Sequence, residues 1–85
     1  MTTNARSKAP HYLVNAFKEL RATQSIDALE FWYIYLDGFV QGLEAVGHIT
    51  AGQAEKIIKQ RDKIYDVREE LLIKEESRQR YNAIG

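Results

Sequence analysis

Few residues in this sequence are suited to acid–base, nucleophilic or metal chemistry. His11 and His48 are the only histidines, and the 85 residues include no cysteine. Without cysteine, neither a disulfide nor a thiolate zinc site can form. No serine has a candidate base beside it in the sequence, and no glycine-rich phosphate loop is present. The sequence therefore predicts a non-enzymatic protein without cofactor or metal, although folding could still bring two carboxylates together.

Two arginines occupy unusual positions for charged residues. Arg61 and Arg68 lie among pairs of apolar residues that repeat every seven positions between residues 57 and 72. In one interpretation their aliphatic stems pack in the core, while their guanidinium groups bond to acids of a neighbouring helix, such as Asp37. In the other, they are kept for a carboxylate or phosphate from outside the chain. We favour the first interpretation and retain both arginines as interface candidates.

An aromatic helix is predicted over residues 26–46. Apolar residues recur there at intervals of three and four: Ile26, Leu29, Tyr33, Leu36, Val40 and Leu43. Residues 31–36 are apolar in every direction around the axis, so this stretch is either buried all round or exposes a patch. A chain this small can hardly enclose all of these rings, and interface hot spots favour aromatic anchors. Phe31, Trp32 and Tyr35 are therefore candidate interface residues, with a place in the core as the alternative.

Gly38 and Gly42 form a G-x-x-x-G step within the same predicted helix. Each glycine costs about 1 kcal/mol relative to alanine in a helix, so some contact should compensate. Either a partner's backbone comes close to this step, or the glycines make room for the protein's own aromatic core. Both glycines are candidate interface residues.

The aromatic helix also lies in an acidic part of the chain. Residues 26–50 contain four acidic residues and no lysine or arginine. An acidic face of this kind suits a basic partner, including a nucleic-acid-binding protein whose DNA site it would cover. Asp37, Gln41 and Glu44 are its candidate contact residues, and plain solvation of this face is the alternative.

Two further helices are predicted on either side. Pro10 and the apolar spacing after it predict a shorter helix over residues 10–22, preceded by a flexible arm at residues 1–9. Ser25 is a good N-cap for the aromatic helix.

A short turn separates the aromatic helix from the third one. Gly47 suits a left-handed C-terminal cap, and Thr50 with Gln53 matches a capping box that begins a helix over residues 51–80. So short a turn predicts that the two long helices fold back as an antiparallel hairpin. The expected fold is all-α, with residues 10–85 forming a single domain.

Composition limits the partners. With 45% hydrophobic and 28% charged residues, the chain has the composition of a folded globular protein. A domain this small buries only about 60% of the surface that its unfolded chain exposes, so self-association is expected and a homodimer is predicted. Acids offset the basic residues nearly everywhere beyond the N-terminal arm, so direct nucleic-acid binding is not expected. No signal sequence or membrane span is recognisable, which predicts a cytoplasmic location.

One segment resembles a known family. Leu20-Arg21-Ala22-Thr23-Gln24-Ser25-Ile26-Asp27-Ala28-Leu29-Glu30 is similar to the helix–cap–helix entry of the Hha and H-NS nucleoid-protein group, with its Leu-Arg, its Ser/Thr and its Leu-Glu at this kind of spacing. The resemblance implies helical dimerisation or docking onto a nucleoid silencing protein. It covers 11 of the 85 residues, and the charged continuation of that group is replaced here by the aromatic run.

These observations together predict a non-enzymatic protein-binding module. The most concrete version is a small inhibitor or adaptor of the phage or mobile-element type, such as an anti-defence protein; this step is an analogy from size and class. A nucleoid-type transcriptional co-regulator and a structural subunit of a larger assembly are the alternatives.

Overall fold

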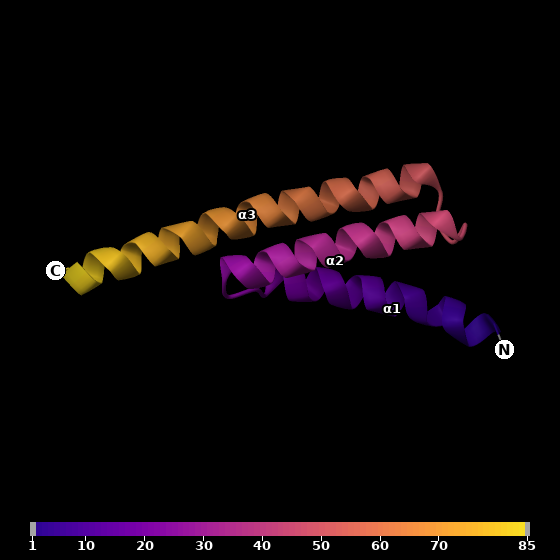
Figure 1. Ribbon diagram of the computed structural model, residues 1–85, viewed down its shortest axis with the longest axis horizontal. Helices are drawn as coiled ribbons and strands as arrows, with labels where there is room; N and C mark the ends of the chain where they lie inside the picture. Colours follow the sequence, from indigo (N-terminus) through magenta and orange to yellow (C-terminus); the bar gives the residue numbers. More distant parts are fainter. Residues whose placement is uncertain (1, 85) are drawn as a thin grey trace.

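Three α-helices make up the described chain: α1 (Thr2–Arg21), α2 (Ile26–Ala45) and α3 (Ala51–Ile84). The computed structural model describes the backbone of residues 2–84 and the side chains of residues 10–79. Helix α2 lies between α1 and α3 (Figure 1). The start of α1 and the end of α3 lie at opposite ends of the long axis. The all-helical prediction is confirmed, since no strand occurs within residues 2–84.

Local hydrogen bonds set the beginnings of α2 and α3, as the cap residues predict. The Ser25 hydroxyl accepts from the Ala28 backbone N–H at 3.1 Å. At the start of α3, the Thr50 N–H donates to Gln53 Oε1 at 2.8 Å, and the Gln53 N–H donates to Thr50 Oγ1 at 3.1 Å. The predicted N-cap and capping box are therefore both confirmed.

The turn after α2 is a Schellman motif. Gly47 has φ +78°, the left-handed conformation in which side chains cause strain. Its N–H donates to the Glu44 carbonyl at 3.0 Å, and the His48 N–H donates to the Leu43 carbonyl at 2.9 Å. The predicted glycine cap is confirmed, and α2 ends at Ala45, one residue earlier than expected.

Two of the predicted helix bounds need correction. Helix α1 begins at Thr2, so residues 2–9 have helical backbone in place of the predicted flexible arm. Their polar composition suggested an arm, but alanine, arginine and lysine are good helix formers and no glycine interrupts them. Helix α3 likewise runs to Ile84, four residues past the predicted end, because no glycine or proline follows Gln53 until Gly85.

The core is small and is supplied by all three helices. Leu20, Leu29 and Leu36 are fully buried, and Phe17 and Leu72 pack in the same cluster. Burying a leucine side chain contributes about 1.5–3 kcal/mol. Val40 and Ala54 are also buried, further toward the turn between α2 and α3.

The molecule is long and thin. Its Cα atoms span 60 × 24 × 13 Å, with a radius of gyration of 16.2 Å. A compact protein of this length has a radius of gyration of about 12 Å. Helix α3, with 34 residues against 20 in α2, extends past the other helices at its C-terminal end (Figure 1). Helix α2 packs against both α1 and α3, and its remaining side is exposed at Phe31, Ile34 and Tyr35. No described helix combines the length and the apolar character needed to cross a membrane.

Candidate protein-interaction surface

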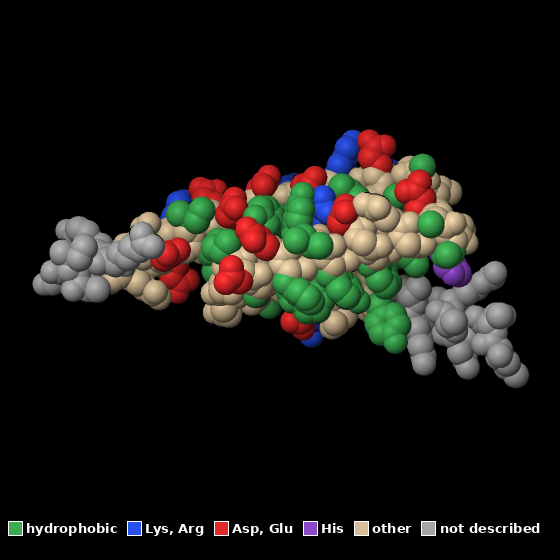
Figure 2. Space-filling model, viewed as in Figure 1, with side chains coloured by type: hydrophobic (Ala, Val, Ile, Leu, Met, Phe, Trp, Pro, Cys, Tyr) green, Lys and Arg blue, Asp and Glu red, His purple; other side chains and the backbone are tan. Residues whose placement is uncertain are grey.

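Helix α2 carries large apolar side chains on the side that faces away from the core. Phe31, Ile34 and Tyr35 are 55%, 68% and 38% exposed, whereas Leu29 and Leu36 of the same helix are fully buried. Residues 31, 34, 35, 38 and 42 recur at helical spacing and share one face. We call this set, Phe31, Ile34, Tyr35, Gly38 and Gly42, the outward face of α2. Figure 2 shows hydrophobic side chains gathered over the middle of the molecule, with acidic side chains above them.

The exposed rings are held in place by their neighbours. Phe31 meets Trp32 edge to face, with ring centroids 5.1 Å apart, and Trp32 meets Tyr35 in the same way at 5.2 Å. Tyr35 then stacks on Phe39 at 5.9 Å. Trp32 itself is half-buried and packs against the core. Trp32 thus connects the exposed rings of Phe31 and Tyr35 to the core. Because these rings are already ordered, they would lose less side-chain entropy on binding.

Neither glycine of the outward face is explained by contacts within the chain. A Cβ atom added at Gly38 or at Gly42 would meet no atom within 4 Å, and both residues are exposed. The interpretation that they make room for the protein's own aromatic core is therefore wrong. The other interpretation, in which the backbone of a partner comes close to Gly38 and Gly42, stays a prediction.

The acidic residues beside the outward face differ in whether they bond within the chain. Asp37 accepts hydrogen bonds from Gln41 Nε2 at 2.8 Å and from Arg61 Nη1 at 3.1 Å, so its carboxylate serves the fold. Glu30 and Glu44 are exposed. These two glutamates, with Asp27, leave α2 with an acidic border at which a cationic side chain could bind.

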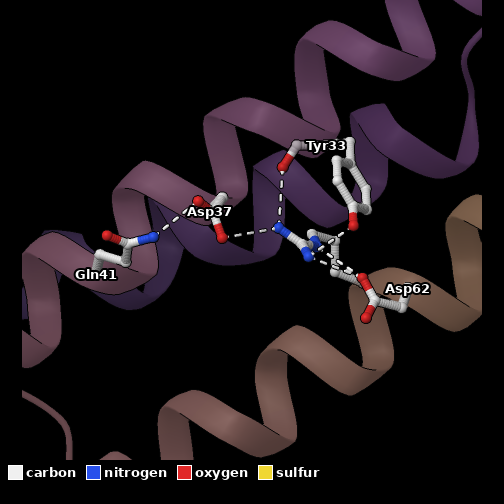
Figure 3. A network of polar contacts seen from close by, with 5 residues as sticks. Tyr33, Asp37, Gln41 and Asp62 are labelled. Atoms are coloured by element: carbon white, nitrogen blue, oxygen red, sulfur yellow. Dashed lines mark hydrogen bonds and ion pairs between the residues drawn. The ribbon is translucent and has the colours of Figure 1, made fainter.

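Arg61 is the most buried charged residue among the described ones, at 5% exposure. Figure 3 shows the polar network of α2 and α3 to which it belongs, with Tyr33, Asp37 and Asp62. Its Nη2 donates to Tyr33 Oη at 2.9 Å and to Asp62 Oδ1 at 2.8 Å. Its Nη1 donates to Asp37 Oδ1 and to the Tyr33 carbonyl, and its Nε donates to Asp62. The guanidinium carbon also lies 3.7 Å from the centre of the Tyr33 ring. The preferred interpretation of Arg61 is confirmed, because all five donors are used within the chain and none is left for an outside anion.

Arg68 also bonds within the chain, but to backbone. Its Nε and Nη2 donate to the Thr23 carbonyl at 2.8 and 2.6 Å. Thr23 is buried, and its hydroxyl donates to the Leu20 carbonyl at 3.0 Å. Arg68 therefore fixes the connection between α1 and α2 onto α3. The prediction that it would reach an acid of the aromatic helix is wrong, since its guanidinium group donates to the Thr23 carbonyl in the connection after α1.

Two tyrosines line the contact between α2 and α3. Tyr33 and Tyr65 have ring centroids 4.6 Å apart, and Tyr65 Oη donates to Glu69 at 3.1 Å. Burial raises the pKa of Tyr33 above its ordinary value, and the Asp62 carboxylate adds to the rise. Burial likewise raises the pKa of Tyr65, with Glu69 adding to it. Both hydroxyls therefore stay neutral to higher pH in the folded protein than in the unfolded chain.

The structure separates the predicted interface residues into two groups. Exposed on or beside the outward face are Phe31, Tyr35, Gly38, Gln41, Gly42 and Glu44. The other four serve internal packing or bonding: Trp32, Asp37, Arg61 and Arg68.

Sequence reasoning missed two members of this surface. Ile34 is the most exposed apolar residue of the outward face, and the only signal for it was an apolar residue interrupting an otherwise polar face. Phe39, which is half-buried, stacks on Tyr35 at the edge of this surface and was not among the predicted interface residues.

No group of His, Cys, Asp and Glu side chains that could hold a metal ion occurs among the described residues. No family model, curated protein or solved structure matches the chain, so the resemblance of residues 20–30 to the Hha and H-NS group stays a prediction.

Proposed function

We propose that this protein is a non-enzymatic binding module, in which an antiparallel hairpin of α2 and α3, braced by α1, presents the outward face of α2 to another protein. One observation carries the proposal. Phe31, Ile34 and Tyr35 are exposed beside two helical glycines that no contact within the chain explains.

The residue types of this face suit an interface. Exposed apolar side chains next to one another cost free energy in water, and a partner that covers them recovers about 25 cal/mol per Å². The aromatic rings are already ordered through Trp32, so little side-chain entropy is lost when a partner binds. Gly38 and Gly42 let a partner's backbone approach more closely than any other residue type would.

The acidic border indicates the chemistry of the partner. Asp27 and Glu30 precede the apolar residues of the outward face along α2 and Glu44 follows them, and α2 contains no basic residue. The partner should therefore offer an apolar groove or helix flanked by lysine or arginine. By covering a surface of its partner, the protein would work as a small inhibitor or adaptor; a phage or mobile-element role, such as an anti-defence protein, is an analogy from size and class.

A matched pair of substitutions tests the proposal. Ile34→Asp places a charge in the centre of the outward face, and Val14→Asp places one at an equally exposed site on α1, since the two side chains are 68% and 67% exposed. Affinity capture from the native host should recover the same partner with the wild type and with Val14→Asp, and lose it with Ile34→Asp. If Ile34→Asp recovers that partner at the wild-type level, the outward face is not the surface that binds it.

Charge reversal is a second, independent test. Glu30→Lys should weaken capture of the same partner, whereas Glu19→Lys on α1 should leave it unchanged, because both glutamates are exposed and only Glu30 borders the outward face. Asp37 is unsuitable for this purpose, since its loss would also break the ion pair with Arg61.

A further inference from the structure

A second apolar surface lies between α1 and α3, and it uses no residue of α2. It is a groove lined by Arg21, Lys63, Ile64, Val67, Arg68 and Leu71. Val67 and Leu71 on its floor are 56% and 50% exposed. We call it the basic groove, because its charged lining residues are all cations. Arg68 bonds to the Thr23 carbonyl, which leaves Arg21 and Lys63 as its exposed charges.

Positive charge continues along α3 beyond this groove. Residues 56, 60, 63, 67, 71, 74 and 78 recur at intervals of three and four, so they share one face of the helix. This series contains Lys56, Lys63, Lys74 and Arg78 and no acidic residue, and all of its members are exposed. Lys74 pairs with Glu70 at its edge, 3.2 Å away, but that pair is exposed and weak.

Three of the seven acids of α3 lie on a different face of the helix, whereas Glu70 borders the cationic series. Asp62, Asp66 and Glu69 follow one another at intervals of four and three, and Asp62 contacts Arg61 beside Tyr33 of α2. Acids of α3 thus lie on the same side as the acidic border of α2. The chain has zero net charge, yet Asp62, Asp66 and Glu69 lie toward α2, while Lys56, Lys63, Lys74 and Arg78 lie on the face of α3 that includes the basic groove.

We infer that the basic groove of one copy of this chain receives the outward face of α2 from a second copy. The two surfaces match in chemistry. Phe31 and Ile34 would cover the apolar floor of the groove, while the acidic border of α2 would meet Arg21 and Lys63. The inference takes from the proposed function only that the outward face of α2 is a contact surface.

Charge also argues against the simplest alternative, a symmetric dimer through two copies of α2. That helix contains four acidic residues and no basic one, so two copies placed face to face would bring like charges together. A contact between the outward face and the basic groove joins different surfaces of the two copies. Each end of the assembly then keeps one unused surface, so further copies can add.

Complementation between two variants tests this arrangement. Ile34→Asp places a charge in the outward face and leaves the basic groove intact. Val67→Asp places a charge in the basic groove and leaves the outward face intact. By sedimentation velocity and light scattering, the wild type should associate as its concentration rises, and each variant alone should remain a monomer of 9.8 kDa. An equimolar mixture of the two variants should form a one-to-one dimer that grows no further. Circular dichroism on each variant checks that it remains helical.

Charge exchange provides a variant pair that leaves the apolar residues untouched. Lys63→Glu and Glu30→Lys should each weaken the association at least tenfold, and their mixture should regain a dimer through the one contact in which both charges are exchanged. If Val67→Asp or Lys63→Glu alone still dimerises as the wild type does, the contact is a symmetric one and the inference is overturned. A wild-type chain that stays monomeric at every concentration overturns it as well.

The two proposals can fail separately. If the wild type is monomeric but Ile34→Asp loses the partner captured from the host, the basic groove is not a contact surface and the proposed function stands. If the variants complement each other but Ile34→Asp recovers every partner of the wild type, self-assembly stands and the proposed function falls.

Discussion

At the scale of single residues, Arg61 shows how a charge can be buried in a small helical protein. Its side chain is 6% exposed, while the side chains of Asp37 and Asp62 remain 47% and 48% exposed. The cost of removing charge from water therefore falls on the arginine, and five hydrogen bonds and the Tyr33 ring compensate for it. Because these acceptors have fixed positions on α2 and α3, Arg61 fixes how the two helices align.

Arg61→Met should lower the free energy of unfolding by about 1.5–3 kcal/mol, because it removes hydrogen bonds to charged groups while keeping most of the packing. Lys59→Met is the matched control on the same helix. Lys59 pairs with Glu55 at 3.1 Å, but both side chains are exposed, so its loss should change stability by less than about 0.5 kcal/mol. Urea unfolding followed by circular dichroism measures both. Equal losses in the two variants would show that burial of Arg61 contributes nothing.

The tyrosines beside Arg61 predict a loss of stability at alkaline pH. The pKa of Tyr33 and of Tyr65 is raised above 10.0 in the folded protein, chiefly by burial. The neutral hydroxyl is thus favoured by folding, so this contribution is complete below pH 10 and is lost as the pH rises through the folded-state pKa. The urea concentration at the midpoint of unfolding should decrease as the pH is raised from 9 to 11. The decrease should be smaller in Tyr33→Phe. Tyr35→Phe, at an exposed position, is the control and should leave the decrease unchanged.

At the scale of the helix, three glycines of the same segment should respond differently to alanine. Gly38→Ala and Gly42→Ala should each stabilise the monomer by up to about 1 kcal/mol, because a Cβ meets nothing there and alanine favours the helix. Gly47→Ala should destabilise it by about 1–2 kcal/mol, because Gly47 has φ +78°. Urea unfolding at low protein concentration separates these effects from association. Destabilisation by Gly38→Ala would mean that its face is packed within the chain after all.

Helix ends were the part of the fold that the sequence predicted best. Ser25, Gly47 and the Thr50–Gln53 pair act through neighbours within a few residues, so their local spacing is sufficient to identify them. The start of α1 was predicted less well, because a polar segment can be helical without apolar periodicity.

Contacts between distant parts of the chain could not be predicted. Arg68 donates to a carbonyl 45 positions away, and this depends on where α3 crosses the connection between α1 and α2. The orientation of the aromatic segment was equally open. The spacing placed Tyr33 in the apolar seam, but residues 31–36 are apolar around the whole helix, so periodicity could not decide that Phe31 and Tyr35 are exposed while Trp32 packs against the core.

At the scale of the whole molecule, the separation of charge onto two sides predicts a response to salt. In dilute solution at high salt, small-angle X-ray scattering should give a radius of gyration near the 16.2 Å of the Cα trace. At low salt the charges act over a longer range, since the screening length rises from about 3 Å at 1 M to about 30 Å at 0.01 M. Lower salt and higher concentration should therefore increase the radius together. An unchanged radius under both conditions would contradict charge-assisted association.

The two exposed glycines of α2 also have a consequence for protein engineering. A procedure that ranks substitutions by thermal stability alone would replace Gly38 and Gly42 with alanine early, since the isolated chain gains from both changes. The same methyl groups would keep a docking backbone at a distance. A thermostabilised version of this protein would then be a more robust fold that has lost its partner, and a library selected for binding should keep glycine at both positions.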